Sequence, residues 1–196
     1  MKKLIYFFIF LILSTNTNAN ITDDFKNFSI LENPKKYEDI IFEDFEGNFI
    51  NLNNINSKIY IINFWATWCA PCKEEMPYLD KIHKIDGIYV VPVNLEAKNQ
   101  KKTKKFFDDI KIKNLSIYFD NDMKLVKLFK LRGVPTTVIL NKNQEEIARV
   151  IGTLDFTDEK IINWLQQAQV SLCLCPITLR LLFFLHQYQL LRYHLL

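Results

Sequence analysis

The stretch that decides the fold is residues 59–73, which read IYIINFWATWCAPCK. Its first seven residues are apolar except for Asn63, which is typical of a central β-strand covered on both faces. The segment that follows has helical spacing and begins with Cys69 and Cys72. Two cysteines separated by two residues at the start of a helix can form a disulfide, and we expect Cys69 to be exposed for exchange with other thiols. The stretch therefore predicts a redox site between a strand and a helix.

The overall charge gives no indication of a nucleic-acid partner. The chain has 196 residues and a formal net charge of +3, and four of its positive charges lie at its two ends, on Lys2, Lys3, Arg180 and Arg192. Subtracting these four charges from +3 leaves the body of the chain at −1. A nearly neutral body lacks the positive field that binds nucleic acid or an anionic surface.

The N-terminal residues 1–19 have the pattern of a secretory signal peptide. Lys2 and Lys3 precede an apolar run over residues 4–13, and Ala19 ends a small-residue cleavage signal. The apolar run is about half as long as the ~20 residues that a membrane-spanning helix needs. An uncleaved anchor, with membrane association through this segment, is the alternative. Both interpretations predict export to the periplasm, where a disulfide can persist.

Composition divides the rest of the chain into three parts. We expect a polar linker over residues 20–37 and one folded domain over residues 38–167. The tail over residues 168–196 is crowded with leucine and has no Lys, Asp, Glu or Gly after Val170. This abrupt change suggests an unstructured segment or the product of a reading-frame change. The alternative is a membrane-associating helix, although its uncharged run over residues 181–191 is too short to span a bilayer.

Strands and helices alternate through the predicted domain. Two short apolar runs around Glu46-Gly47-Asn48 predict a β-hairpin over residues 40–52. Further strands are predicted at 59–65, 88–93, 115–119, 136–140 and 147–151, and helices from the cysteine motif to about 85 and at 100–110, 123–130 and 158–167. This order predicts an α/β fold in which helices flank a mixed sheet.

The residues around the cysteine pair suggest how it would work. At a helix N-terminus, free N–H groups and the helix dipole favour the thiolate of Cys69, which suits the attacking role. Cys72 lies one turn further in, and Pro71 is tolerated in the opening turn because it lacks only an N–H that has no helical partner. Glu75 lies on the same helix face as Cys72 and can either relay its proton or be one more exposed charge.

Pro135 is the second candidate element of the site. It lies in Gly133-Val134-Pro135-Thr136-Thr137, at a turn that enters a strand. A cis peptide bond is inexpensive only before proline, and a cis Pro135 beside the cysteines would leave the backbone of Val134 free to pair with a substrate. From this motif alone, an ordinary trans turn proline is the alternative, and it is the more common case.

Together these motifs resemble the thioredoxin superfamily and, within it, the secreted TlpA/ResA-like thiol–disulfide oxidoreductases. The resemblance covers residues 38–167 and rests on NFWATWCAPCKEEMP at 63–77 and GVPTT at 133–137. It implies a thioredoxin-like sheet with an N-terminal β-hairpin and a strand–helix insertion over residues 94–119. It also implies that Cys69 is the nucleophile and Cys72 the resolving cysteine.

The resemblance assigns further roles around this pair. It implies that Glu75 is the acid beside the disulfide and that Pro135 is a cis proline. Asn63 stands where cytoplasmic thioredoxins carry a buried aspartate, which shifts the proton-relay role toward Glu75. Client contacts are expected from Trp68, Ala70, Pro71 and Val134, while Trp65 fits the rim of the site or the core.

The resemblance implies a function in the periplasm. Such proteins reduce the haem-binding cysteines of apocytochrome c or the copper-site cysteines of a cytochrome oxidase subunit, with electrons from a membrane thiol–disulfide transporter. A general oxidant of exported proteins is the alternative. We expect protein thiol clients, no cofactor and a monomer.

Two other classes of function are weighed against the enzyme. Cys69, Cys72, Cys173 and Cys175 can offer four thiolates to zinc or copper. That set of cysteines would make the chain a metal-binding protein, and the second class is a thioredoxin-fold binding module without turnover. The Ala-Pro spacer and the Gly133–Thr137 motif argue against a metal site, and the intact cysteine pair argues against a module without turnover.

Overall fold

A computed structural model describes residues 21–171 of the chain. The predicted signal peptide over 1–19 and nearly all of the predicted tail, including Cys173 and Cys175, lie outside the described residues. Within residues 21–171, no helix is both long enough and apolar enough to cross a membrane.

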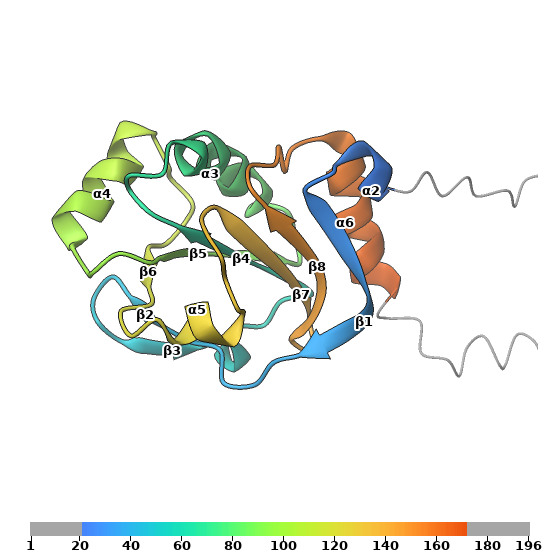
Figure 1. Cartoon of the computed structure of the whole chain (residues 1–196), viewed down its shortest axis with the longest axis horizontal. Coiled ribbons are helices and arrows are strands. Elements are labelled where there is room, and N and C mark those ends of the chain that lie inside the picture. Colours follow the sequence, from blue (N-terminus) through green and yellow to red (C-terminus); the bar gives the residue numbers. More distant parts are fainter. Residues whose placement is uncertain (1–20, 172–196) are drawn as a thin grey trace, which may run out of the picture.

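One eight-stranded mixed sheet forms the centre of the molecule, with the strand order β1-β8-β7-β4-β5-β6-β2-β3 (Figure 1). The central strand β4 (Ile59–Trp65) is buried along its whole length, parallel to β5 (Ile88–Asn94) and antiparallel to β7 (Thr136–Asn141). The other strands are β1 (Phe28–Lys36), β2 (Ile41–Asp44), β3 (Phe49–Asn51), β6 (Tyr118–Phe119) and β8 (Glu145–Ile151). The predicted mixed sheet flanked by helices is therefore confirmed.

Alternate residues of β4 serve two separate cores, because successive side chains of a strand point to opposite faces. Ile59, Ile61 and Trp65 pack on one face, with α3 (Ala70–Ile82), α4 (Gln100–Asp109) and α6 (Glu159–Ser171). Tyr60, Ile62 and Phe64 pack on the other, with α5 (Lys124–Leu128) and the β2–β3 hairpin. Figure 1 shows α3 and α5 on opposite sides of the sheet. Asn63 is odd-numbered like Ile61 and Trp65, so its side chain points to the same face of the sheet, under α3.

The N-terminal hairpin and the insertion are present. β2 and β3 pair antiparallel, and Asp44 closes their turn by accepting hydrogen bonds from the backbone of Gly47 (2.8 Å) and Asn48 (2.7 Å). The insertion after β5 contains α4 and the two-residue strand β6, which pairs parallel with β5 and antiparallel with β2.

The prediction of a linker over residues 20–37 was wrong. The short helix α2 (Ile21–Asp24) and β1 occupy this stretch, and β1 pairs antiparallel with β8 at the edge of the sheet. Only Phe28 of β1 is buried, so the strand lacks the alternating apolar pattern that sequence reasoning relies on. Its register also shifts between Ile30 and Lys35, around Pro34, which has no N–H for the ladder. At the other end, α6 continues to Ser171, beyond the predicted domain boundary at 167.

We expect the core on the α5 face to carry a large share of the stability. Phe129 is 1% exposed, and its ring centroid lies 4.6 Å from that of Tyr37 and 5.5 Å from that of Phe64. Phe129→Ala should therefore lower the free energy of unfolding by about 3–5 kcal/mol in a urea titration. Phe49→Ala, at a side chain that is 75% exposed, is the matched control and should change it by about 0.5 kcal/mol or less. Equal losses in the two variants would contradict this assignment of the core.

Candidate active site

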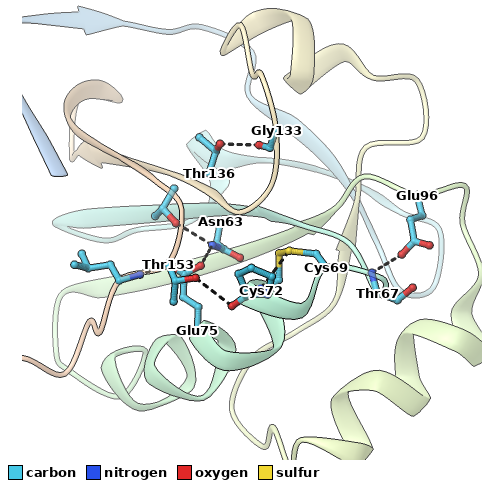
Figure 2. Close-up of a disulfide and its surroundings, with 12 residues drawn as sticks. Asn63, Thr67, Cys69, Cys72, Glu75, Glu96, Gly133, Thr136 and Thr153 are labelled. Atoms are coloured by element: carbon cyan, nitrogen blue, oxygen red, sulfur yellow. Dashed lines mark hydrogen bonds between the residues drawn. A yellow bond between two sulfur atoms is a disulfide. The ribbon is translucent and has the colours of Figure 1, made fainter. Parts of the chain in front are cut away.

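A disulfide joins Cys69 and Cys72 at the N-terminus of α3, directly after β4 (Figure 2). Cys69 is the N-cap of α3, and its sulfur accepts a hydrogen bond from the backbone N–H of Cys72 at 3.2 Å. Pro71 occupies the first turn, where no helical hydrogen bond is lost. The helix dipole and the free N–H groups of this turn favour negative charge on Cys69 when the pair is reduced.

The expectation that Cys69 is exposed was wrong for this oxidised form. Cys69 is 4% exposed and Cys72 is 1% exposed, and both belong to the core cluster under α3. Bonding to Cys72 holds the Cys69 sulfur against the helix. The residues around the pair are open instead, since Trp68 is 71% exposed and Ala70 and Pro71 are exposed as well.

Glu75 is a buried carboxyl beneath the disulfide, so the alternative of an exposed helix charge was wrong. Its side chain is 0% exposed, whereas its neighbours Lys73 and Glu74 are exposed. The backbone N–H of Leu154 donates to Oε1 of Glu75 at 3.1 Å, and the amide of Asn63 donates to Oε2 at 2.9 Å. Burial raises the pKa of Glu75 to about 7, although these two hydrogen bonds act to lower it. Glu75 can therefore exchange a proton near neutral pH.

Asn63 connects Glu75 to β7. Its Nδ2 donates to Oε2 of Glu75 and also to Oγ1 of Thr137 at 2.8 Å, while its Oδ1 has no hydrogen-bond partner among residues 21–171. Sequence reasoning identified Asn63 and Glu75 but missed Thr137 and the backbone of Leu154. Their contacts join residues 74 and 79 positions apart in the chain, which no local pattern reports.

The peptide bond between Val134 and Pro135 is cis, as the family resemblance implied. The N–H of Gly152 donates to the carbonyl of Pro135 at 2.9 Å, and the hydroxyl of Thr153 donates to the carbonyl of Pro71 at 3.5 Å. The loop after β8 thus holds the Pro135 turn and the first turn of α3 together. Val134 is half-buried beside them.

The turn between β4 and Cys69 is held by a carboxylate that sequence reasoning missed. Glu96 accepts hydrogen bonds from the backbone N–H of Thr67 at 2.5 Å and from Nζ of Lys102 at 2.6 Å. Partial burial by itself would raise the pKa of Glu96, but the hydrogen bonds from Lys102 and Thr67 outweigh it and lower the pKa to about 2. Glu96 is therefore ionised at neutral pH and anchors the turn to the insertion.

Trp65 belongs to the core and not to the rim of the site. It is 0% exposed, and its ring centroid lies 4.7 Å from that of Phe106 and 5.5 Å from that of Phe107. No group of three or more His, Cys, Asp or Glu side chains in residues 21–171 is arranged to hold a metal ion. Cys173 and Cys175 of the four-cysteine alternative lie outside this part of the chain.

The chain is similar to known proteins in sequence and in fold. The chain is 32% identical over 108 residues to the thiol-disulfide oxidoreductase ResA of Halalkalibacterium halodurans, a match that covers 54% of this chain and 60% of that relative. StoA from Bacillus subtilis superposes with a TM-score of 0.53 at 28% identity and covers 64% of this chain and 95% of its own.

A DsbF homologue from Corynebacterium diphtheriae shows the same fold. It superposes with a TM-score of 0.60 at 24% identity, over 70% of this chain and 92% of its own. The model of the AhpC/TSA family matches residues 22–149, from α2 into β8, and so includes the disulfide, Glu75 and Pro135. The chain therefore belongs to the AhpC/TSA family and has its thioredoxin-like fold.

Proposed function

We propose that this protein is an enzyme that exchanges disulfides with protein thiols through Cys69 and Cys72. The observation that carries the proposal is the disulfide at the N-terminus of α3, directly above a buried carboxyl. A disulfide with a purely structural role needs no group beside it that titrates near neutral pH. The name of the ResA relative, a thiol-disulfide oxidoreductase, supports the same activity.

In the first step, the reduced protein attacks a disulfide of its client. The thiolate of Cys69 forms a new bond to one client sulfur, the client disulfide breaks, and the second client sulfur leaves as a thiolate. The position of Cys69 at the helix N-terminus stabilises the attacking thiolate. We assign the client contacts to the exposed Trp68, Ala70 and Pro71 and to the backbone of Val134, beside the cis Pro135.

In the second step, Cys72 resolves the mixed disulfide. Its thiol transfers a proton to the carboxylate of Glu75, and the resulting thiolate attacks the sulfur of Cys69. The Cys69–Cys72 bond forms, the bond from Cys69 to the client breaks, and the client leaves with its second thiolate. The client is reduced by two electrons and this protein is oxidised to the form that the structure shows.

The physiological direction that we propose is reduction, in the periplasm. The N-terminal signal pattern supports export, and the resemblance to the TlpA/ResA-like proteins supports clients in cytochrome c or cytochrome oxidase copper-site biogenesis. A membrane thiol–disulfide transporter would return the electrons, and the protein would act as a monomer. A general oxidant of exported proteins is the second candidate.

The roles of the two cysteines can be tested by trapping. Cys72→Ser should accumulate mixed disulfides between Cys69 and client proteins, because nothing remains to resolve them. Cys69→Ser should accumulate none, since the attacking thiolate is absent. Non-reducing gels and mass spectrometry of the two variants measure this difference. Equal yields of adducts from both variants would refute the assignment of roles.

The role of Glu75 predicts the pH dependence of the second step. The carboxylate accepts a proton only when it is ionised, so resolution of a preformed mixed disulfide should speed up as pH rises through about 7 and then level off. Glu75→Gln should slow resolution about 10²-fold at pH 7 and remove this inflection. Glu74→Gln, at the exposed neighbour, is the matched control and should leave the profile unchanged. An inflection that persists in Glu75→Gln would exclude Glu75 as the acceptor.

The direction of electron flow can be read from the reduction potential of the Cys69–Cys72 pair. We expect a value near the roughly −270 mV that is typical of thioredoxin, because a reductant must hold its electrons weakly enough to pass them to a client. Equilibration in dithiothreitol or glutathione buffers, followed by alkylation and mass analysis, gives this value. A potential near the roughly −120 mV of DsbA would instead establish an oxidant and reject the biogenesis role.

A further inference from the structure

The polar cluster beneath the disulfide presents only donors to Glu75. Asn63 Nδ2 donates to Oε2 of Glu75 and to Oγ1 of Thr137, and the Leu154 N–H donates to Oε1 of Glu75. This arrangement suits an ionised carboxylate. Within the part of the chain that the structure describes, Oδ1 of Asn63 has no hydrogen-bond partner, although the side chain is 0% exposed. A buried amide with one unpartnered end is costly, so its presence calls for an explanation.

A protonated Glu75 cannot be satisfied by the same arrangement. The partner beside Oε1 is the Leu154 N–H and the partner beside Oε2 is Nδ2 of Asn63, and both are donors, so neither offers an acceptor to the hydrogen of the acid. A backbone N–H cannot become an acceptor, but a side-chain amide exchanges its donor and its acceptor by turning through 180° about its last bond. The Thr137 hydroxyl adapts to either orientation, since it can donate or accept.

We propose that Asn63 is a positioning residue whose side-chain amide turns over when Glu75 gains or loses its proton. Beside the carboxylate, Nδ2 donates to Glu75 and to Thr137, as in the structure. Beside the carboxylic acid, Oδ1 takes the position that Nδ2 has in the structure, and it accepts hydrogen bonds from both the Glu75 O–H and the Thr137 hydroxyl. In the observed orientation the atom without a partner among residues 21–171 is Oδ1, and in the turned orientation it would be Nδ2, so the protonation state of Glu75 sets which orientation is occupied.

The surroundings of Glu75 allow this coupling. The groups that face it are Asn63 from β4, the N–H of Leu154 from the loop after β8 and, one turn earlier in α3, Cys72, while Thr137 from β7 reaches it through Asn63. The causes that move its pKa are burial and the two hydrogen bonds, and the resulting value of about 7 populates both protonation states near neutral pH.

Rotation of the Asn63 amide would assist the proposed resolving step. This inference rests on the proposed role of Glu75 as the acceptor of the Cys72 proton. If the amide were a fixed donor, each proton that arrived at Oε2 would face the N–H of Asn63, and the protonated product would be disfavoured. A turning amide gives the new O–H an acceptor at once, and it returns to the donor orientation when the proton leaves.

Nuclear magnetic resonance of the labelled, oxidised protein tests the turn directly, because neither cysteine titrates while the disulfide is intact. The Glu75 carboxyl carbon and the contact between the Asn63 amide protons and the Thr137 methyl group are followed across the Glu75 pKa of about 7. We expect the amide–methyl contact above the midpoint of Glu75 and its loss below, with the same midpoint. A contact that persists while Glu75 titrates, or a Glu75 that does not titrate there, would overturn the proposal.

Two controls make the result specific. Glu75→Gln places an N–H₂ group where Oε2 lies, so the Asn63 amide should keep Oδ1 directed toward residue 75. The contact between the Asn63 amide protons and the Thr137 methyl group should then be absent at every pH. A contact retained in this variant would also overturn the proposal. The amide of Asn48 donates to Asp44 at the surface, at 2.9 Å, and it should not follow the titration of Glu75 because the pKa of Asp44 is lowered below its usual value.

A thiol-exchange assay on the same sample separates the two proposals. A wild-type protein without exchange activity would refute the proposed function and leave the magnetic-resonance result intact. Normal exchange together with a fixed Asn63 amide would refute only the proposed rotation of the amide.

Discussion

The burial of β4 on both faces is the constraint on which the rest of the structure depends. A strand between two cores must divide its side chains by parity, and in β4 the odd-numbered residues face α3 while the even-numbered residues face α5. Asn63 is the polar exception in this strand, and its parity places it beneath the helix that carries the cysteines. The same strand ends at Trp65, so the chain leaves the sheet just before Cys69 and enters α3 with the pair at its first turn.

The site combines an electropositive helix end with a buried acid. The helix N-terminus favours negative charge on Cys69, whereas burial opposes negative charge on Glu75 and raises its pKa to about 7. These opposite effects, at positions six residues apart in the chain, are what the proposed attacking thiolate and the proposed proton acceptor require. Glu96 holds the turn before Cys69, and the loop after β8 contacts both the Pro135 turn and α3, so two separate segments hold the site in place.

Much of this arrangement could be predicted from the chain, and the misses have physical causes. The apolar run at 59–65 and the Cys69–Cys72 spacing are local patterns, and they predicted the central strand, the helix and the redox pair. β1 was missed because an edge strand with one buried side chain has no alternation to detect. The prediction that Cys69 is exposed was wrong for the disulfide form, in which Cys69 packs in the core cluster under α3, because exposure depends on packing that the local motif does not report.

The sequence by itself determined the chemistry: two cysteines at a helix start, a carboxyl one turn later and a proline before a strand, all readable because helix geometry relates neighbours in the chain. Only the tertiary structure decided what these groups experience. Whether Glu75 is exposed or buried depends on residues 12 and 79 positions away, since Asn63 and Leu154 close over it when the sheet forms. Thr137 and Glu96 join the site for the same reason, because burial and hydrogen bonding depend on distance in space and not on separation along the chain.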